Sequence, residues 1–159
     1  MTRLPGNVKL LMAGTGGAAS SRPPEFYRQL AGELGVRRRC AWDLRRIPEE
    51  EVGDLFAACD CVLLTYSARF RSASGVLSTA VAARKPVLAS SGEGPLKKAI
   101  RGYGLGVWVE PDSVDALVGG FEKLQTDPPR PDWEGYLRDH SWKRNAEVVG
   151  RELFGASPA

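Results

Sequence analysis

The chain has 159 residues, a length that suits one domain with its own hydrophobic core. Hydrophobic residues make up 43% of it and charged residues 26%, as in ordinary globular proteins and unlike disordered chains. The formal net charge of +3 is small, and the densest basic run, Arg37-Arg38-Arg39, is interpreted as a solvent-exposed face, so no nucleic-acid partner is expected.

Cysteine and histidine usage argues against a metal centre. The three cysteines, Cys40, Cys59 and Cys61, lack metal-ligand spacing, and we expect them to be buried free thiols in a reducing compartment. His140 is the only histidine and is expected at a helix boundary. No apolar run approaches the roughly 18 residues that span a bilayer, and the N-terminus has no secretory pattern. These features predict a cytoplasmic protein without a membrane span, and they leave peripheral membrane contact open.

Short apolar runs alternate with helical patterns along the chain. Strands are predicted over residues 8–13, 39–42, 61–66, 86–90 and 106–110. Helices are predicted over residues 24–34, 48–58, 75–84, 95–101, 113–125 and 133–153, the last with a break near His140 and Ser141. The strands are continuously apolar rather than alternating, which is typical of a parallel sheet covered by helices on both faces. The sequence therefore predicts an α/β, Rossmann-like doubly wound fold, in a single domain over residues 1–154 with a frayed tail over 155–159.

The most informative segment runs from Tyr66 to Leu77, with the sequence YSARFRSASGVL. It follows an apolar strand and leads into a helix rich in small residues, so several backbone N–H groups should lie at the positive end of that helix. Such an arrangement binds phosphate oxygens well. Ser74 could instead only cap the helix, and the two roles are compatible because a cap position is also an anion position.

A second glycine-containing loop, Gly14-Thr15-Gly16-Gly17, follows the first strand. It lacks the complete Gly-x-Gly-x-x-Gly spacing of dinucleotide-binding proteins and the Lys-Ser/Thr pair of a Walker loop, so a tight turn is the favoured interpretation. No Gly-x-Ser-x-Gly sequence follows a strand, which argues against a serine hydrolase.

Seven segments, taken in order, resemble a known family. They are VKLLMAG (8–14), RIPEEEV (46–52), LFAACDCVLL (55–64), SGVL (74–77), AARKPVLAS (82–90), GLG (104–106) and SWKRNA (141–146). Their order and spacing resemble the C-terminal, donor-binding domain of retaining GT-B-type glycosyltransferases of group 1, the family 4-like enzymes. The resemblance spans nearly the whole chain.

The resemblance implies a role in binding a nucleotide-diphosphate sugar at the carboxyl ends of the strands. Backbone amides around Ser74, Gly75 and Val76 would hold the diphosphate, with the Ser72 and Ser74 hydroxyls as additional donors. The nucleotide sugar is then a substrate, its base is open, and no cofactor is expected. No catalytic side chain is assigned.

The chain departs from the family at the positions near the donor sugar and ribose. Many members carry two glutamates eight residues apart, and those positions fall at Arg71 and Thr79. Thr79 offers one hydroxyl where the family offers a carboxylate, and Arg71 inverts the charge. Arg71 could hold a phosphate or be a solvated loop residue. Glu93 could reach a donor sugar hydroxyl or be an exposed loop carboxylate.

The second departure concerns the start of the domain. Family C-terminal domains normally begin with one further strand and helix, and omitting a central first strand is expected to split the sheet. The resemblance therefore implies the donor-binding half of a glycosyltransferase that is inactive without an N-terminal half, supplied in cis or in trans. The alternatives are a non-catalytic binding or interaction module that keeps the fold and, third, half of a nucleotide-sugar epimerase.

Overall fold

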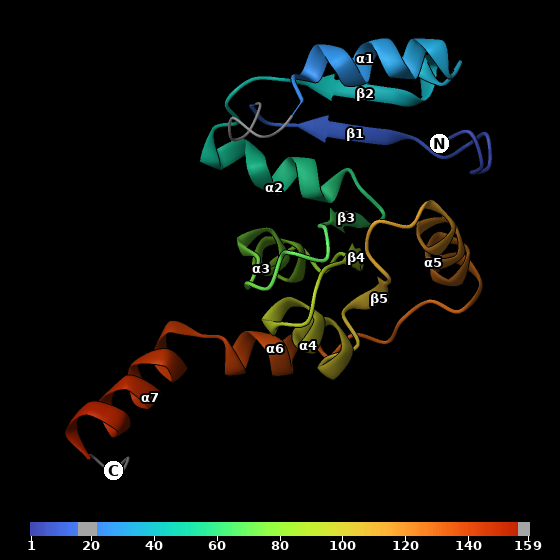
Figure 1. Cartoon of the computed structure of the whole chain (residues 1–159). Helices are drawn as coiled ribbons and strands as arrows, with labels where there is room; N and C mark the ends of the chain where they lie inside the picture. Colours follow the sequence, from blue (N-terminus) through green and yellow to red (C-terminus); the bar gives the residue numbers. More distant parts are fainter. Residues whose placement is uncertain (16–21, 156–159) are drawn as a thin grey trace. The chain divides into compact units, whose positions relative to one another are not determined.

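The computed structural model describes residues 1–15 and 22–155, and its elements alternate as the sequence predicts (Figure 1). The strands are β1 (Leu10–Ala13), β2 (Cys40–Asp43), β3 (Val62–Thr65), β4 (Val87–Ser90) and β5 (Gly106–Val109). The helices are α1 (Pro24–Glu33), the 3-10 helix η1 (Arg37–Arg39), α2 (Glu49–Ala57), α3 (Gly75–Ala82), α4 (Pro95–Gly102), α5 (Val114–Thr126), α6 (Trp133–Asp139) and α7 (Trp142–Phe154). Every predicted strand and helix is present, whereas η1 was not predicted. The predicted frayed tail lies largely outside the described residues.

The strands form two parallel sheets rather than one. The strands β1 and β2 pair within a compact unit of residues 1–59, and β3, β4 and β5 pair in that order within a second unit of residues 60–159. All pairs are parallel, with Leu10 opposite Cys40 in the first sheet and Val62 opposite Val87 in the second. The α/β class and the interrupted sheet are therefore confirmed. The assignment of residues 1–154 to a single domain stays a prediction.

In the first unit, Arg39 ties the segment before β1 to the start of β2. Its guanidinium donates to the backbone oxygens of Val8 (3.0 Å), Leu4 (3.2 Å) and Pro5 (2.6 Å). The interpretation of the arginine run as a solvated face holds for Arg37 and Arg38 but is wrong for Arg39, which is half-buried. The planar fork of an arginine can satisfy several carbonyl groups at once, and local sequence does not reveal which carbonyls lie within reach.

Two further sequence predictions concern the first unit. Gly14 has a φ of +115°, as a tight turn after β1 requires, while Gly16 and Gly17 of the same predicted turn lie outside the described residues. Cys40 and Cys59 of this unit, and Cys61 of the second unit, are in no disulfide, and all three are half-buried rather than buried as predicted.

In the second unit, β4 is the buried centre of the sheet, and helices cover both faces (Figure 1). Helix α5 packs on Val107 and Val109, together with Leu88 of β4. Trp108 points to the opposite face, where the Nζ of Lys97 from α4 lies 3.7 Å from the centre of its ring. Successive strand residues face opposite sides of a sheet, so α4 and α5 cover different faces of β5.

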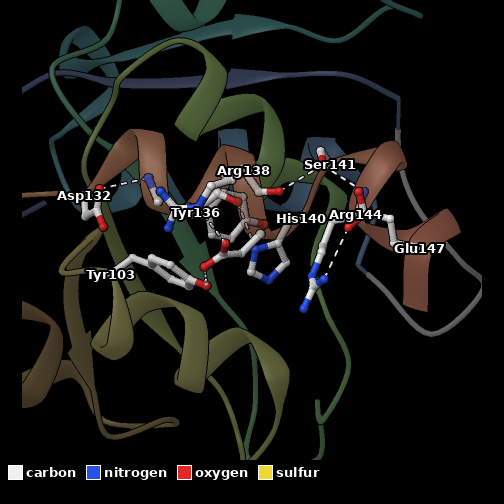
Figure 2. Close-up of polar contacts among 10 residues, drawn as sticks. Tyr103, Asp132, Tyr136, Arg138, His140, Ser141, Arg144 and Glu147 are labelled. Carbon is white, nitrogen blue, oxygen red and sulfur yellow. Dashed lines mark hydrogen bonds and ion pairs between the residues drawn. The ribbon is translucent and has the colours of Figure 1, made fainter. Parts of the chain in front are cut away.

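Helix α6 is fixed to the second unit by aromatic packing (Figure 2). The Tyr136 side chain is 5% exposed, stacks on His140 at 4.1 Å between ring centres, and meets Tyr103 edge-on at 5.5 Å. Its hydroxyl lies 3.2 Å from the Ser78 Oγ of α3. Helix α6 therefore packs against α3 at Ser78.

The predicted break near His140 and Ser141 is confirmed, with His140 as the residue that ends α6 and Ser141 as the residue that caps α7. Helix α7 buries no residue whose side chain is described, and Trp142 is 90% exposed. None of the helices in the described part of the chain is long and apolar enough to cross a membrane.

Candidate functional site

A loop of residues 66–74, here called the entry loop because it leads into α3, lies at the carboxyl ends of the second unit's strands. Its first residue is held twice by the end of β4: the Tyr66 N–H donates to the Ser90 carbonyl (3.0 Å), and the Ser90 hydroxyl donates to the Tyr66 carbonyl (2.8 Å). Further along, the Ala68 N–H donates to Oδ2 of Asp112, which follows β5 (3.2 Å). The loop that could bind a ligand is therefore anchored to the ends of two strands.

Two glycines let the entry loop pack directly on the loop after β4. A Cβ on Gly92 would lie 2.1 Å from the Ala68 carbonyl oxygen, and one on Gly94 would lie 2.5 Å from the Arg71 carbonyl oxygen. The Gly92 N–H also donates to the Phe70 carbonyl at 3.0 Å. The two loops thus meet backbone to backbone, an approach that any side chain at these positions would prevent.

The start of α3 leaves backbone donors open. Ser74 occupies the N-cap position with extended backbone (φ −121°, ψ 122°), but its side chain accepts no hydrogen bond from the helix. In the described part of the chain, the N–H groups of Gly75 and Val76 have no acceptor, and both residues are exposed. The position predicted for Ser74 is confirmed, whereas capping by its side chain is wrong.

The Ser74 hydroxyl is engaged elsewhere. It lies 3.2 Å from the hydroxyl of Tyr66, and the Ser74 residue is 7% exposed. The Tyr66 ring in turn stacks on Phe70 at 4.0 Å between ring centres, with an interplanar angle of 14°. An aromatic pair within the entry loop therefore fixes the side chain that would otherwise cap α3.

The structure brings five of the sequence-predicted site residues together at the start of α3. Ser72 is exposed and Ser74 buried, and the amides of Gly75 and Val76 follow directly. Arg71 is exposed, and its guanidinium has no partner among the described residues. The helix dipole, the open amides and a free cation all favour an anion at this place.

The other two predicted residues are already engaged by neighbours. Thr79 lies one turn into α3, where its hydroxyl donates to the Gly75 carbonyl at 3.4 Å. Glu93 forms an ion pair with Lys97, and this hydrogen bond lowers the pKa of the Glu93 carboxyl. With its side chain 78% exposed, Glu93 has the properties of a loop carboxylate at the margin of the site.

Sequence reasoning missed the contacts that hold the entry loop in place. Asp112 is not among the predicted site residues, yet its carboxylate binds the loop 44 residues earlier. Its φ of +58° is a conformation that aspartate tolerates better than most residues. The only available signal was its position directly after a strand, since the carboxyl ends of parallel strands meet at one edge.

Across the described residues, no group of three or more His, Cys, Asp or Glu side chains lies close enough together to hold a metal ion. The chemistry of the site rests on backbone amides, hydroxyls and arginine, which are donors for phosphate oxygens.

Comparison with protein families gives a match over residues 2–147 to the glycosyl transferases group 1. The chain belongs to this family. A search among curated proteins found no match. The resemblance stated from the sequence is therefore confirmed by a family match over most of the chain.

Solved glycosyltransferases share the fold. HepE from Anabaena, in complex with UDP, is 20% identical with a TM-score of 0.64, over 96% of this chain and 38% of HepE. The lipopolysaccharide outer core galactosyltransferase WaaB is 17% identical with a TM-score of 0.74, over 97% of this chain and 42% of WaaB. Sucrose-phosphate synthase from Thermosynechococcus elongatus is 24% identical with a TM-score of 0.69, over 94% and 39%. This group 1 chain thus spans less than half the length of these relatives.

Proposed function

We propose that this chain is the donor-binding half of a glycosyltransferase, and that it holds the diphosphate of a nucleotide sugar at the start of α3. The observation that carries the proposal is the pair of open N–H groups on Gly75 and Val76, at the end of a loop that is anchored to two strands. Family membership and the UDP complex of HepE support this ligand class.

The proposed contacts divide the work between backbone and side chains. The amides of Gly75 and Val76 and the hydroxyls of Ser72 and Ser74 donate to the phosphate oxygens, and Arg71 adds positive charge. As the bond between sugar and diphosphate breaks, negative charge grows on the leaving group, and fixed donors stabilise it without reorganising. Thr79 remains the proposed ribose position, with one hydroxyl to offer.

Transfer itself requires an acceptor. Because this chain spans 38–42% of HepE, WaaB and sucrose-phosphate synthase, we propose that a second half binds the acceptor, either in the same polypeptide or as a partner chain. The chain taken alone should then bind the donor but transfer no sugar.

The test is a calorimetric titration of the 159-residue chain with UDP, GDP and ADP, repeated on one variant and a matched control. Gly75→Pro removes one open amide at the first helical position, where proline fits, and Ser74 already has the extended backbone that a residue before proline needs. Val114→Pro makes the same change at the start of α5, after Ser113 with φ −125° and ψ 115°.

At least one nucleoside diphosphate should bind, Gly75→Pro should weaken it on the order of tenfold, and Val114→Pro should leave it unchanged, because a hydrogen bond to a charged group contributes about 1.5–3 kcal/mol. If none of the three nucleotides binds, the donor-site proposal fails and a non-catalytic module that keeps the fold is favoured. If Gly75→Pro binds as tightly as the unchanged chain, the site lies elsewhere.

A further inference from the structure

We infer that Tyr66 is a positioning residue that keeps the start of α3 open for an anion, by drawing the Ser74 hydroxyl away from the helix. The inference rests on the proposed function, since it concerns the same site.

A serine at the N-cap normally accepts a hydrogen bond from the second or third amide of its own helix. The chain contains this arrangement: at the start of α5, the Ser113 Oγ accepts from the Ala116 N–H at 3.1 Å. Ser74 has nearly the same backbone angles as Ser113, yet it makes no such bond. Neither the residue type nor the backbone conformation explains the difference.

What differs is the competing partner. The Tyr66 hydroxyl lies 3.2 Å from the Ser74 Oγ, and Ser74 is 7% exposed, so water has little access to replace this contact. When Tyr66 donates, the Ser74 proton is free to point toward a phosphate oxygen. The same contact would thus leave the helix amides open and turn the Ser74 hydroxyl into an additional donor.

Tyr66 is itself held from three sides. Its N–H and carbonyl both bond to Ser90 at the end of β4, and its ring stacks on Phe70. The position of its hydroxyl therefore follows from the strand end and the stack, and does not depend on Ser74. Removing only the hydroxyl should leave the ring and the loop in place.

The experiment is a double-mutant cycle of Tyr66→Phe and Ser74→Ala, with two readouts: UDP affinity by calorimetry and amide hydrogen exchange at Val76 and Leu77. In Tyr66→Phe the freed Ser74 hydroxyl should cap the helix, so exchange at one of these amides slows. UDP affinity should fall about fivefold, the factor expected if an average N-cap bond must break before phosphate binds. With Ser74→Ala already present, Tyr66→Phe should change neither readout.

The matched control is Tyr103→Phe, which removes a hydroxyl bonded to Asp139 and should leave UDP affinity unchanged. Unaltered amide exchange and UDP affinity in Tyr66→Phe would overturn the inference, as would an equal loss of affinity with and without Ser74. Absence of binding of UDP, GDP and ADP alike by the unchanged chain would count against the proposed function instead. In that case amide exchange in Tyr66→Phe still decides whether Tyr66 diverts Ser74.

Discussion

The start of α3 differs from the starts of α5, α6 and α7 in how the first backbone N–H groups of the helix are treated. Each helix begins with N–H groups that have no partner inside the helix. Three helices satisfy one such group with their own N-cap side chain: Ser113 in α5, Asp132 in α6 and Ser141 in α7. Helix α3 also begins after a serine, but Ser74 bonds to Tyr66 and the first amides stay open.

The difference marks α3 as the helix whose first amides stay open, and under the proposed function these amides bind the diphosphate. The N-cap residues of α1, α2 and α4 are Pro23, Pro48 and Gly94, which have no side-chain acceptor. Within the described chain, α3 is thus the helix that has a capping side chain and leaves it unused. A local rule broken while neighbouring helices obey it is typical of functional sites.

The largest expected effect comes from Gly92→Ala, which attacks the support of the entry loop. The new Cβ would meet the Ala68 carbonyl at 2.1 Å, and because that atom is backbone, the whole loop must shift. We expect a loss of about 1–3 kcal/mol in the free energy of unfolding, as for other overpacked sites, together with weaker UDP binding. Urea denaturation and calorimetry measure the two effects.

Gly119→Ala is the matched control for this substitution. Gly119 lies inside α5, and a Cβ there would meet nothing within 4 Å. Alanine should stabilise the chain by roughly 0.5–1 kcal/mol through helix propensity and leave UDP binding alone. If Gly92→Ala behaves like Gly119→Ala, the two loops do not pack as the structure has them.

The helices and strands could be predicted because residues close to each boundary in the sequence determine where the element begins and ends. Pro95 opens α4, Ser113 caps α5, and the break between α6 and α7 falls at His140 and Ser141. The position of the candidate site followed from the same logic, since a Ser-Gly turn after a strand places amides at a helix start.

Whether the first amides of α3 are capped or open could not be predicted, because this depends on the path of the entry loop. Whether Ser74 caps its helix depends on Tyr66, eight residues earlier, and on the stack that aims the tyrosine hydroxyl. The hydrogen bond from Ala68 to Asp112, and the close approach of Gly92 to the Ala68 carbonyl, are contacts between segments that are distant in sequence and that only the sheet brings together. Such contacts have no period or motif in the sequence.

A smaller effect distinguishes the two kinds of helix start directly. Ser113→Ala removes the acceptor of the Ala116 N–H, so it should cost about 1 kcal/mol of stability and speed hydrogen exchange at Ala116, with UDP binding unchanged. Ser74→Ala removes no acceptor from α3, so exchange at Val76 and Leu77 should stay as it is. Faster exchange at these amides in Ser74→Ala would show that Ser74 does cap α3, and the contrast would disappear.

The smallest expected effect concerns the pH dependence of stability at the C-terminal end of α6, which lies beside Tyr103 (Figure 2). The Tyr103 hydroxyl donates to Asp139 at 2.9 Å, which lowers the pKa of the Asp139 carboxyl and raises the pKa of Tyr103. The lowered pKa of Asp139 stabilises the fold at pH values above the pKa that this carboxyl has in the unfolded chain. This stabilisation is lost as pH falls through the pKa of Asp139 in the folded chain. The raised pKa of Tyr103 stabilises the fold below the pKa that tyrosine has in the unfolded chain. This stabilisation is lost as pH rises through the pKa of Tyr103 in the folded chain.

Tyr103→Phe should remove the part of each contribution that comes from the bond between Tyr103 and Asp139, while Arg138, which also bonds to Asp139, still lowers the pKa of that carboxyl. The difference in unfolding free energy between the unchanged chain and Tyr103→Phe should be small, because Asp139 is exposed. It should be constant between about pH 4 and pH 10 and shrink on either side, as denaturation across that range would show. A difference that grows toward acid would mean that Asp139 is stabilised in its protonated form, contrary to the geometry. The affinity for UDP should be the same with and without the substitution at every pH. The bond between Tyr103 and Asp139 lies at the C-terminal end of α6, which has no open amides that could bind a ligand.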